Sequence, residues 1–378
     1  MQDIHSEFPD MGVSYLNNAS VSRMPRSVLR AMAEFAEGYD RAGPDSRAAA
    51  AMVEDAARGV RRMVSGMLRC QPDEVSITQS TTDGINMVAG GLSAAPGSNI
   101  VMREAAYEHH ANVLPWLGMG LESRMMPVDP DGLFGMGDLE AAVDGRTALV
   151  TLSHALYNTG AILPLGEVGR MLGGSVPFFV DAAQTVGCVE CNCSRMNCDY
   201  MALNGSKWLC GPMGTGLFYC SRRAAPGLRP VILGGESAMV YERDRIAFKD
   251  GPGRFEGGFR NHVGVAGLEA ALRVVSGVGL DVIRRRNMAH AAALREGLAD
   301  IPGVVVYGTG GEGHTSVVPF NLEGTDPAGV VERLEARGVV MALREIGPLK
   351  TVRASPHFYN TIQDVERAVR VVADVRNA

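Results

Sequence analysis

Several features that mark particular classes of protein are missing from this chain. No run of about 18 apolar residues occurs, which argues against a conventional transmembrane helix. No internal repeat or low-complexity tract is present, and aromatic residues make up only 6% of the 378 residues. The net charge is −6 and no basic stripe runs along the chain, so we expect neither a membrane nor a nucleic acid as a partner.

The N-terminal residues carry neither the basic nor the apolar segment of a secretory signal, so we expect a cytoplasmic protein. Seven cysteines, an odd number in a chain of this length, are then expected to be reduced thiols. Four of them crowd together and could suggest a zinc or iron–sulfur site: Cys188, Cys191, Cys193 and Cys198. Because their spacing fits no paired C-x2-C pattern, we predict that the chain holds no metal.

Short apolar runs alternate with segments of helical periodicity, which is typical of a parallel sheet joined by crossover helices. Several runs are apolar on both faces, as expected of an α/β sheet covered by helices on both sides. The strands expected in this sheet are residues 75–79, 99–102, 148–153, 177–181, 200–203 and 216–220.

From about residue 264 the pattern changes to a long helical region over 265–300, followed by shorter strands. These strands are expected at residues 304–307, 316–321, 339–343 and 352–354. We therefore predict a large domain over residues 15–260. A small C-terminal α+β domain would comprise residues 261–378 together with the N-terminal segment 1–14.

Two charged residues follow neighbouring strands of the predicted sheet. Asp181 stands at the carboxyl end of a parallel strand, where α/β sheets bind ligands, although such an Asp taken alone suggests a helix N-cap. Lys207 comes 26 residues later, after the next strand. An isolated lysine is usually solvated, but desolvation at a strand end lowers the pKa of the amine and makes it nucleophilic. The spacing allows a short helix and one strand, which would bring both residues to one edge of the sheet.

Two further segments follow strands. Residues 80–83, Ser-Thr-Thr-Asp, stand before a helix, where backbone N–H groups and hydroxyls bind anions; an ordinary helix cap is the alternative. In Glu108-His109-His110 the adjacent histidines are poorly spaced to chelate a metal, so one ring is better explained as a flat stacking partner. An anion cradle, a stacking ring, a carboxylate and a nucleophilic lysine are the four contacts that pyridoxal phosphate needs.

Several short motifs, taken together in their order along the chain, indicate a particular family. The sequence resembles the class V aminotransferase family, which includes cysteine desulfurases, kynureninase and isopenicillin N epimerase-like proteins. The resemblance runs nearly end to end and is carried by residues 15–20, 81–86, 108–112, 153–154 with 158–160, 181–184, 205–208, 211–216, 254–258 and 353–361. It implies the fold-type I architecture of pyridoxal-phosphate enzymes, with a mostly parallel seven-stranded sheet, and a homodimer with its sites at the interface.

The resemblance also implies roles for the residues that bind the cofactor. Lys207 would carry pyridoxal 5′-phosphate as a Schiff base and then act as general base at the substrate α-carbon. Thr81 and Thr82 would hold the phosphate, and His109 would stack on the ring. Asp181 would pair with the ring nitrogen.

Other matched positions are expected around the same site. Gln184 would bond the phenolic oxygen, and Asn158 is expected to face that oxygen, with Tyr157 as a competitor. Ser206, where many relatives carry His, is expected to bond the phosphate. Arg353 would clamp the substrate carboxylate with a bidentate pair, and a surface salt bridge is the alternative.

One matched residue and one departure from the family pattern concern the substrate. Asn18, in the first matched segment, is expected among the substrate contacts. Phe259 stands where relatives often carry a Thr that reaches the partner subunit's phosphate. Arg260 is expected to replace that contact or to bind substrate.

The best-known reaction of the family, sulfur transfer through a thiol on a loop before the last Arg motif, meets an obstacle. The corresponding short loop, residues 342–350, holds no cysteine, and none follows Cys220. We therefore expect transamination or β-elimination of a carbon–sulfur bond in an amino-acid substrate. A cysteine desulfurase, an epimerase and a non-catalytic cofactor-binding relative are the alternatives. Arg344 in this loop could help to recognise an acidic substrate.

Two other patterns suggest sites that we do not expect. The four crowded cysteines lie where the family has a surface connection, which further argues against a metal. Residues 308–313 match G-x-G-x-x-G, but a strand-like segment follows them, so the dinucleotide-binding interpretation fails its structural test.

Overall fold

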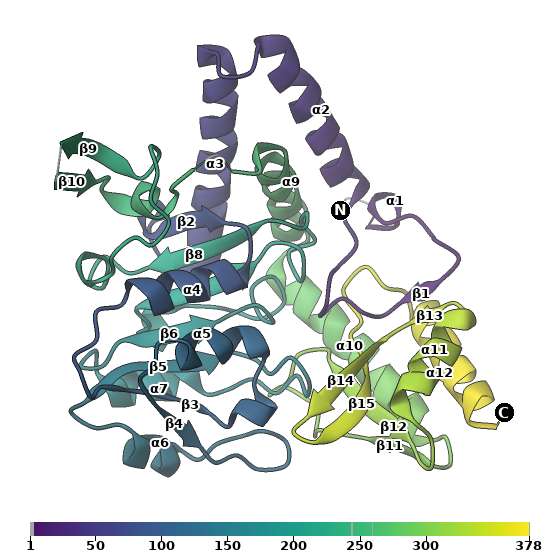
Figure 1. The fold of residues 1–378 in the computed structure, drawn as a ribbon. Coiled ribbons are helices and arrows are strands. Elements are labelled where there is room, and N and C mark those ends of the chain that lie inside the picture. The colour runs from purple at the N-terminus through teal and green to yellow at the C-terminus, as the bar shows by residue number, and fades with distance from the viewer. Residues whose placement is uncertain (1–3, 243–244, 259, 378) are drawn as a thin grey trace.

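The computed structural model describes residues 4–242, 245–258 and 260–377 (Figure 1). Its large sheet has seven strands in the order β2-β8-β7-β6-β5-β3-β4. Only β8 runs antiparallel to its neighbours, so the predicted mostly parallel seven-stranded sheet is confirmed. The strands are β2 (Val75–Thr78), β3 (Asn99–Arg103), β4 (Glu122–Met126), β5 (Thr147–Ser153), β6 (Phe178–Asp181), β7 (Tyr200–Asn204) and β8 (Gly216–Cys220).

The sequence predicted six of these strands and missed β4. This strand lies at the sheet edge, and of its five residues only Met126 is buried. It therefore lacks the apolar run that identified the others. Charged side chains such as Glu122 and Arg124 are common on edge strands, where they discourage pairing with another chain.

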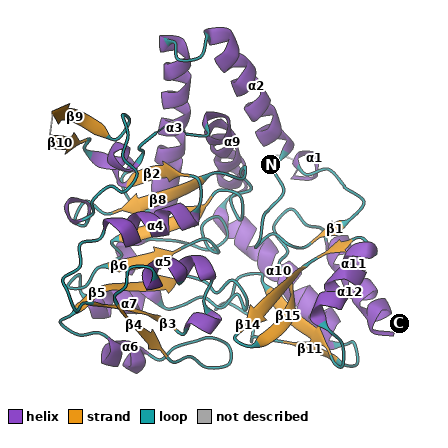
Figure 2. Cartoon of the chain, viewed as in Figure 1, coloured by secondary structure: helices purple, strands orange, loops and turns teal. Residues whose placement is uncertain are grey.

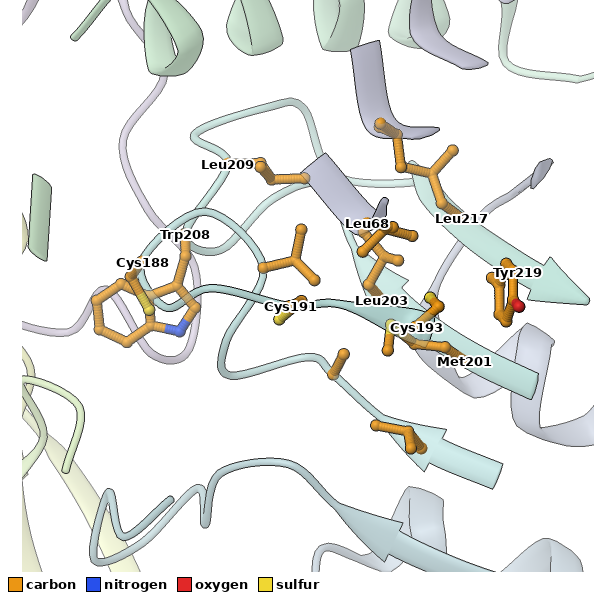
Figure 3. Packing of buried hydrophobic residues seen from close by; sticks show 14 of the residues in the cluster. Leu68, Cys188, Cys191, Cys193, Met201, Leu203, Trp208, Leu209, Leu217 and Tyr219 are labelled. Carbon is orange, nitrogen blue, oxygen red and sulfur yellow. The ribbon is translucent and has the colours of Figure 1, made fainter. Parts of the chain in front are cut away.

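Alternation along β7 shows how the sheet is buried. Tyr200 and Ala202 belong to one core cluster, whereas Met201 and Leu203 belong to another, which Figure 3 shows in part. Successive side chains of a strand point to opposite faces, so the sheet is covered on both sides. Helices α4 (Thr81–Gly91) and α5 (Leu114–Leu117) contribute to the first cluster, and α3 (Arg47–Leu68) and α7 (Leu165–Leu172) to the second.

Further elements surround the sheet. Helix α2 (Arg26–Ala42) and α3 extend beyond it, and both pack against α9 (His262–Val278) (Figure 1). Strands β9 (Ala238–Glu242) and β10 (Arg245–Phe248) form a separate hairpin. The short helices are α1 (Ile4–Glu7), α6 (Met136–Ala142), α8 (Cys193–Met196) and the 3-10 turns 72–74, 105–107, 110–112, 225–227 and 251–255.

The C-terminal part has its own antiparallel sheet (Figure 2), in the order β11-β12-β15-β14. It also has its own core cluster. Strand β1 (Ser14–Tyr15) pairs with β13 (Val339–Val340), which ties the N-terminal segment to this part. The domain boundary at residues 260 and 261 stays a prediction. The other elements here are α10 (Leu280–Ala299), β11 (Val304–Val306), β12 (Val318–Leu322), α11 (Pro327–Ala336), β14 (Ala342–Ile346), β15 (Leu349–Ala354) and α12 (Ile362–Asn377).

Three local expectations for this part differ from or agree with the structure. The helical region predicted over 265–300 is two helices, α9 and α10, bent by 80° at Gly279, whose φ of +86° suits glycine. The predicted loop over 342–350 is mostly strand, because β14 and β15 form a tight hairpin. Residues 308–313 lead toward β12 and not into a helix.

No single helix within residues 4–377, the gaps at 243–244 and 259 aside, is long and apolar enough to span a membrane.

Candidate active site

The carboxyl ends of β5, β6 and β7 bring the first site residues together. Asp181 ends β6 and pairs in register with Ser153, the last residue of β5. Lys207 follows β7 after a turn in which the Asn204 side chain accepts hydrogen bonds from the Ser206 N–H and hydroxyl, both at 2.7 Å. Asp181 caps no helix; one of its oxygens accepts the Ala183 N–H at 2.9 Å. The edge predicted to hold Asp181 and Lys207 is therefore the edge at which they lie.

Burial and the charge of the other group set the pKa values of Lys207 and Asp181. Burial lowers the pKa of Lys207 to about 8, against the opposing pull of the Asp181 charge. Burial also raises the pKa of Asp181 to about 6, while the Ala183 N–H and Lys207 oppose that rise. A lysine whose pKa lies near neutrality has a large fraction of neutral, nucleophilic amine.

His109 lies close enough to Lys207 to sense its charge. Desolvation by the surrounding protein, followed by the positive charge of Lys207, lowers the pKa of His109 to about 4, so the ring is neutral at pH 7. Its Nδ1 accepts the Ala111 N–H at 3.2 Å, and the Tyr157 ring meets it edge-on at 5.0 Å. His109 remains exposed, which leaves the neutral ring available to a flat ligand.

The segment Ser80–Thr82 begins α4 as predicted. The Ser80 hydroxyl caps the helix by accepting the Asp83 N–H at 3.1 Å. Thr81 is buried, and within the described part of the chain its hydroxyl has no hydrogen-bond partner. Thr82 is exposed and lines an open cavity of about 780 Å³ with His110. The N–H groups in the first turn of a helix also lack intrahelical acceptors, so α4 offers donors to an anion.

Arg353 is buried in β15 rather than exposed at the surface. Its guanidinium donates to the Tyr157 carbonyl at 2.7 Å and to the Ser20 hydroxyl at 2.8 Å, and no ion pair of Arg353 occurs among the described residues. Burial lowers its pKa to about 9, and the positive charge of Arg344 adds to this effect. Arg344 donates to the same Ser20 hydroxyl at 2.7 Å. Arg353 therefore forms no surface salt bridge, the alternative offered for it, with any residue that the structure describes.

Three predicted contacts are engaged within the protein. Gln184 accepts the Trp208 indole N–H and donates to the Ala19 carbonyl, both at 2.9 Å. Asn158 donates to the Glu345 carbonyl at 2.8 Å, which ties it to the β14–β15 hairpin. Asn18 is fully buried and donates to the Ser355 carbonyl at 2.8 Å. Roles for these three residues toward a ligand stay predictions.

Arg260 binds Glu256, a carboxylate that also accepts two hydrogen bonds from Arg61 and one from the Ile77 N–H. This cluster ties the segment before α9 to β2. The structure gives no contact between Arg260 and Lys207 in the described residues, so its substrate role stays a prediction. Phe259 lies outside the described residues.

The four crowded cysteines do not form the predicted surface connection; that expectation was wrong. Cys188, Cys191, Cys193 and Cys198 are each no more than 3% exposed and belong to the core cluster of Figure 3. Cysteine packs as a small apolar side chain, which suits this position. No group of three or more His, Cys, Asp or Glu side chains in the described ranges is arranged to hold a metal.

Sequence reasoning missed the residues that hold Arg353. Ser20 and the carbonyl of Tyr157 contribute through contacts that span 333 and 196 residues of chain. Ser20 lies in a segment that the sequence analysis had matched and Tyr157 lies directly beside one, but neither residue type by itself signals an arginine partner.

Comparison with known proteins finds a family model and several similar proteins over almost the whole chain. The family model "Aminotransferase class-V" matches residues 14–368. A probable cysteine desulfurase of Methanothermobacter thermautotrophicus is 33% identical, over 93% of this chain and 92% of the relative. The apo structure of a cysteine desulfurase from Thermococcus onnurineus NA1 superposes with a TM-score of 0.91 at 28% identity, covering 100% of this chain and 98% of the other. The cystine C–S lyase C-DES, in complex with cysteine persulfide, gives 0.89 at 25%, covering 96% and 98%.

Proposed function

We propose that this chain, which belongs to the aminotransferase class-V family, is a pyridoxal 5′-phosphate enzyme that cleaves the carbon–sulfur bond of a cysteine-derived amino acid. The observation that carries the proposal is the grouping of Lys207, Asp181 and His109 at one sheet edge, with Arg353 close enough to lower the pKa of Lys207. This group suits an amino acid held on the cofactor, because it combines a lysine of lowered pKa, a buried carboxylate, a neutral imidazole ring and a buried arginine.

The residues present fit the cofactor. The Thr81 hydroxyl, buried and without a partner in the described chain, and the first N–H groups of α4 would hold the phosphate. His109 would lie on the ring, and the Asp181 carboxylate would face the ring nitrogen. When bound, pyridoxal phosphate supplies an electron sink conjugated with the substrate α-carbon.

Residues of the chain would attach the cofactor, transfer the proton and bind the substrate carboxylate. The Lys207 amine would attach the cofactor and, once displaced by the substrate amine, would take the proton from the α-carbon. Arg353 still has free N–H donors, and its Nε has no partner in the described residues, so it would bind the α-carboxylate. Ser20 and Asn17 would keep the guanidinium oriented.

The relatives' names favour sulfur removal over the transamination that the sequence analysis placed beside it. A desulfurase would convert cysteine and an acceptor thiol into alanine and a persulfide. The β14–β15 hairpin contains no cysteine, and Asn158 and Tyr157 both reach its Glu345 carbonyl, so the acceptor would be a thiol from outside this hairpin.

A second candidate, β-elimination as named for the cystine C–S lyase, is favoured by the same cysteine-free hairpin. Cystine would then yield cysteine persulfide, pyruvate and ammonia, and no enzyme thiol is required. Incubation of the loaded enzyme with cysteine plus a small thiol, and separately with cystine, distinguishes the two. Alanine with persulfide supports desulfuration, and pyruvate with ammonia supports elimination.

The matched controls for this assay are Lys207→Ala, which should abolish both products, and Lys350→Ala, at an exposed position on β15, which should not. Neither product from wild-type enzyme that binds the cofactor, with transamination of other amino acids instead, would refute the carbon–sulfur assignment.

A further inference from the structure

The carboxylate of Glu108 is buried and accepts three hydrogen bonds, and it has no part in the proposed chemistry. Its side chain is only 3% exposed. One oxygen, Oε1, accepts both the Ser153 hydroxyl at 2.7 Å and the His109 backbone N–H at 2.8 Å. The other oxygen, Oε2, accepts Arg103 Nη1 at 3.1 Å. Glu108 therefore joins the backbone of His109 to the end of β5.

Arg103 explains why a charged carboxylate is tolerated here. Its guanidinium is fully buried at the end of β3, and it also donates to the Tyr107 carbonyl at 3.1 Å. Desolvation makes a buried ion pair weak evidence for stability, since apolar side chains of similar size often serve as well. The use of the Glu108 oxygens to hold particular neighbours is therefore more informative than the pair itself.

A second tether lies on the other side of His109. The Asn112 side chain accepts the Thr151 hydroxyl at 2.7 Å and the Trp116 indole N–H at 3.0 Å. Thr151 and Ser153 are two residues apart on β5, so they point to the same face of the sheet. The segment 108–112 is thus held at both ends to one face of β5, with His109 between the two tethers.

We propose that Glu108 is a positioning residue that fixes the His109 ring over the cofactor through the two hydrogen bonds at Oε1, while Arg103 neutralises its charge. The inference rests on the proposed function in one respect, that His109 contacts the cofactor. Ser153 is in register with Asp181, so the same tether sets the height of the ring relative to the carboxylate that faces the cofactor nitrogen.

The two oxygens allow the positioning role to be separated from the ion pair. In Glu108→Gln the amide oxygen can replace Oε1 and keep the bonds to Ser153 and His109, but the charge facing Arg103 is lost. In Glu108→Ala the hydrogen bonds to Ser153 and His109 and the charge facing Arg103 are all lost. The matched control is Glu122→Gln. Glu122 is a half-exposed glutamate that pairs with Arg124 on the same strand, β4. It lies opposite Asn99 at the start of β3, whereas Arg103 lies at the other end of β3.

The experiment measures three properties of each variant: melting temperature, cofactor affinity and absorption maximum, and hydrogen exchange of the 104–112 segment in cofactor-free protein. Both Glu108 variants should melt at a lower temperature than wild type. Only Glu108→Ala should bind the cofactor more weakly, shift its absorption maximum and speed exchange in 104–112. Its turnover should fall by up to about a hundredfold, the cost of a misplacement of about 1 Å. Glu122→Gln should match wild type throughout.

A double variant tests whether the effect acts through His109. If it does, Glu108→Ala in a His109→Ala background should change cofactor affinity little beyond His109→Ala alone. Independent, multiplying effects, or equal losses of affinity in the Gln and Ala variants, would overturn the inference. Should Glu108→Ala not fold, Ser153→Ala removes one Oε1 bond and must weaken cofactor binding in the same direction. A wild-type protein that binds no cofactor would refute the proposed function instead.

Discussion

The depressed pKa of Lys207 predicts how the cofactor-free protein captures pyridoxal 5′-phosphate. The amine reacts when neutral, and burial lowers its pKa from the ordinary 10.5 to about 8. At pH 7 the neutral fraction is then about 300 times that of an ordinary lysine amine, because the shift is about 2.5 pH units. Since the folded pKa lies below the ordinary value, capture should accelerate as pH rises and level off above about pH 8.

The assay uses stopped flow between pH 6 and pH 10.5 and follows the absorbance band at about 420 nm that lysine-bound cofactor gives. N-acetyl-lysine amide is the reference amine, and its rate should keep rising beyond pH 10. Asp181→Asn should shift the midpoint of the protein's profile to lower pH, because the Asp181 charge holds the Lys207 pKa up. A profile that parallels the reference amine would refute the argument that Lys207 is desolvated.

Three further results are expected. Asp181→Asn should weaken cofactor binding and lower turnover by at least about tenfold, measured by cofactor titration and product formation, because hydrogen bonds to charged groups contribute about 1.5–3 kcal/mol; unchanged values would contradict the assigned role. Arg353→Met should raise KM for amino acids more than it lowers kcat, and an unaltered KM would remove Arg353 from the carboxylate site. Cys191→Ser should leave turnover with excess external thiol near wild type, because burial raises the pKa of this thiol to about 12 and keeps it protonated; loss of turnover without loss of folding would give the thiol a chemical role.

The predicted parts of the fold were those that local pattern controls. Apolar runs identified six strands of the large sheet. The convergence of Asp181 and Lys207 also followed from local reasoning, because parallel strands in succession end at the same edge.

The parts that were missed depend on distant contacts or on burial. The bond from Ser153 to Glu108 spans 45 residues, and that from Arg353 to Ser20 spans 333. The cysteine-rich segment was placed at the surface because the family resemblance implies a surface connection there, whereas its thiols fill the core. The 342–350 segment was expected to be a loop, although its residues pair as β14 and β15.

The central claim is that Lys207 carries the cofactor, and the sequence makes it simple to test because the chain has only three lysines, Lys207, Lys249 and Lys350. Reduction of the loaded protein with borohydride fixes the cofactor on the lysine that binds it, and peptide mass spectrometry identifies that lysine. The account predicts nearly stoichiometric labelling of Lys207 and none of the other two. Labelling at Lys249 or Lys350, or unlabelled Lys207 in protein saturated with cofactor, would contradict it.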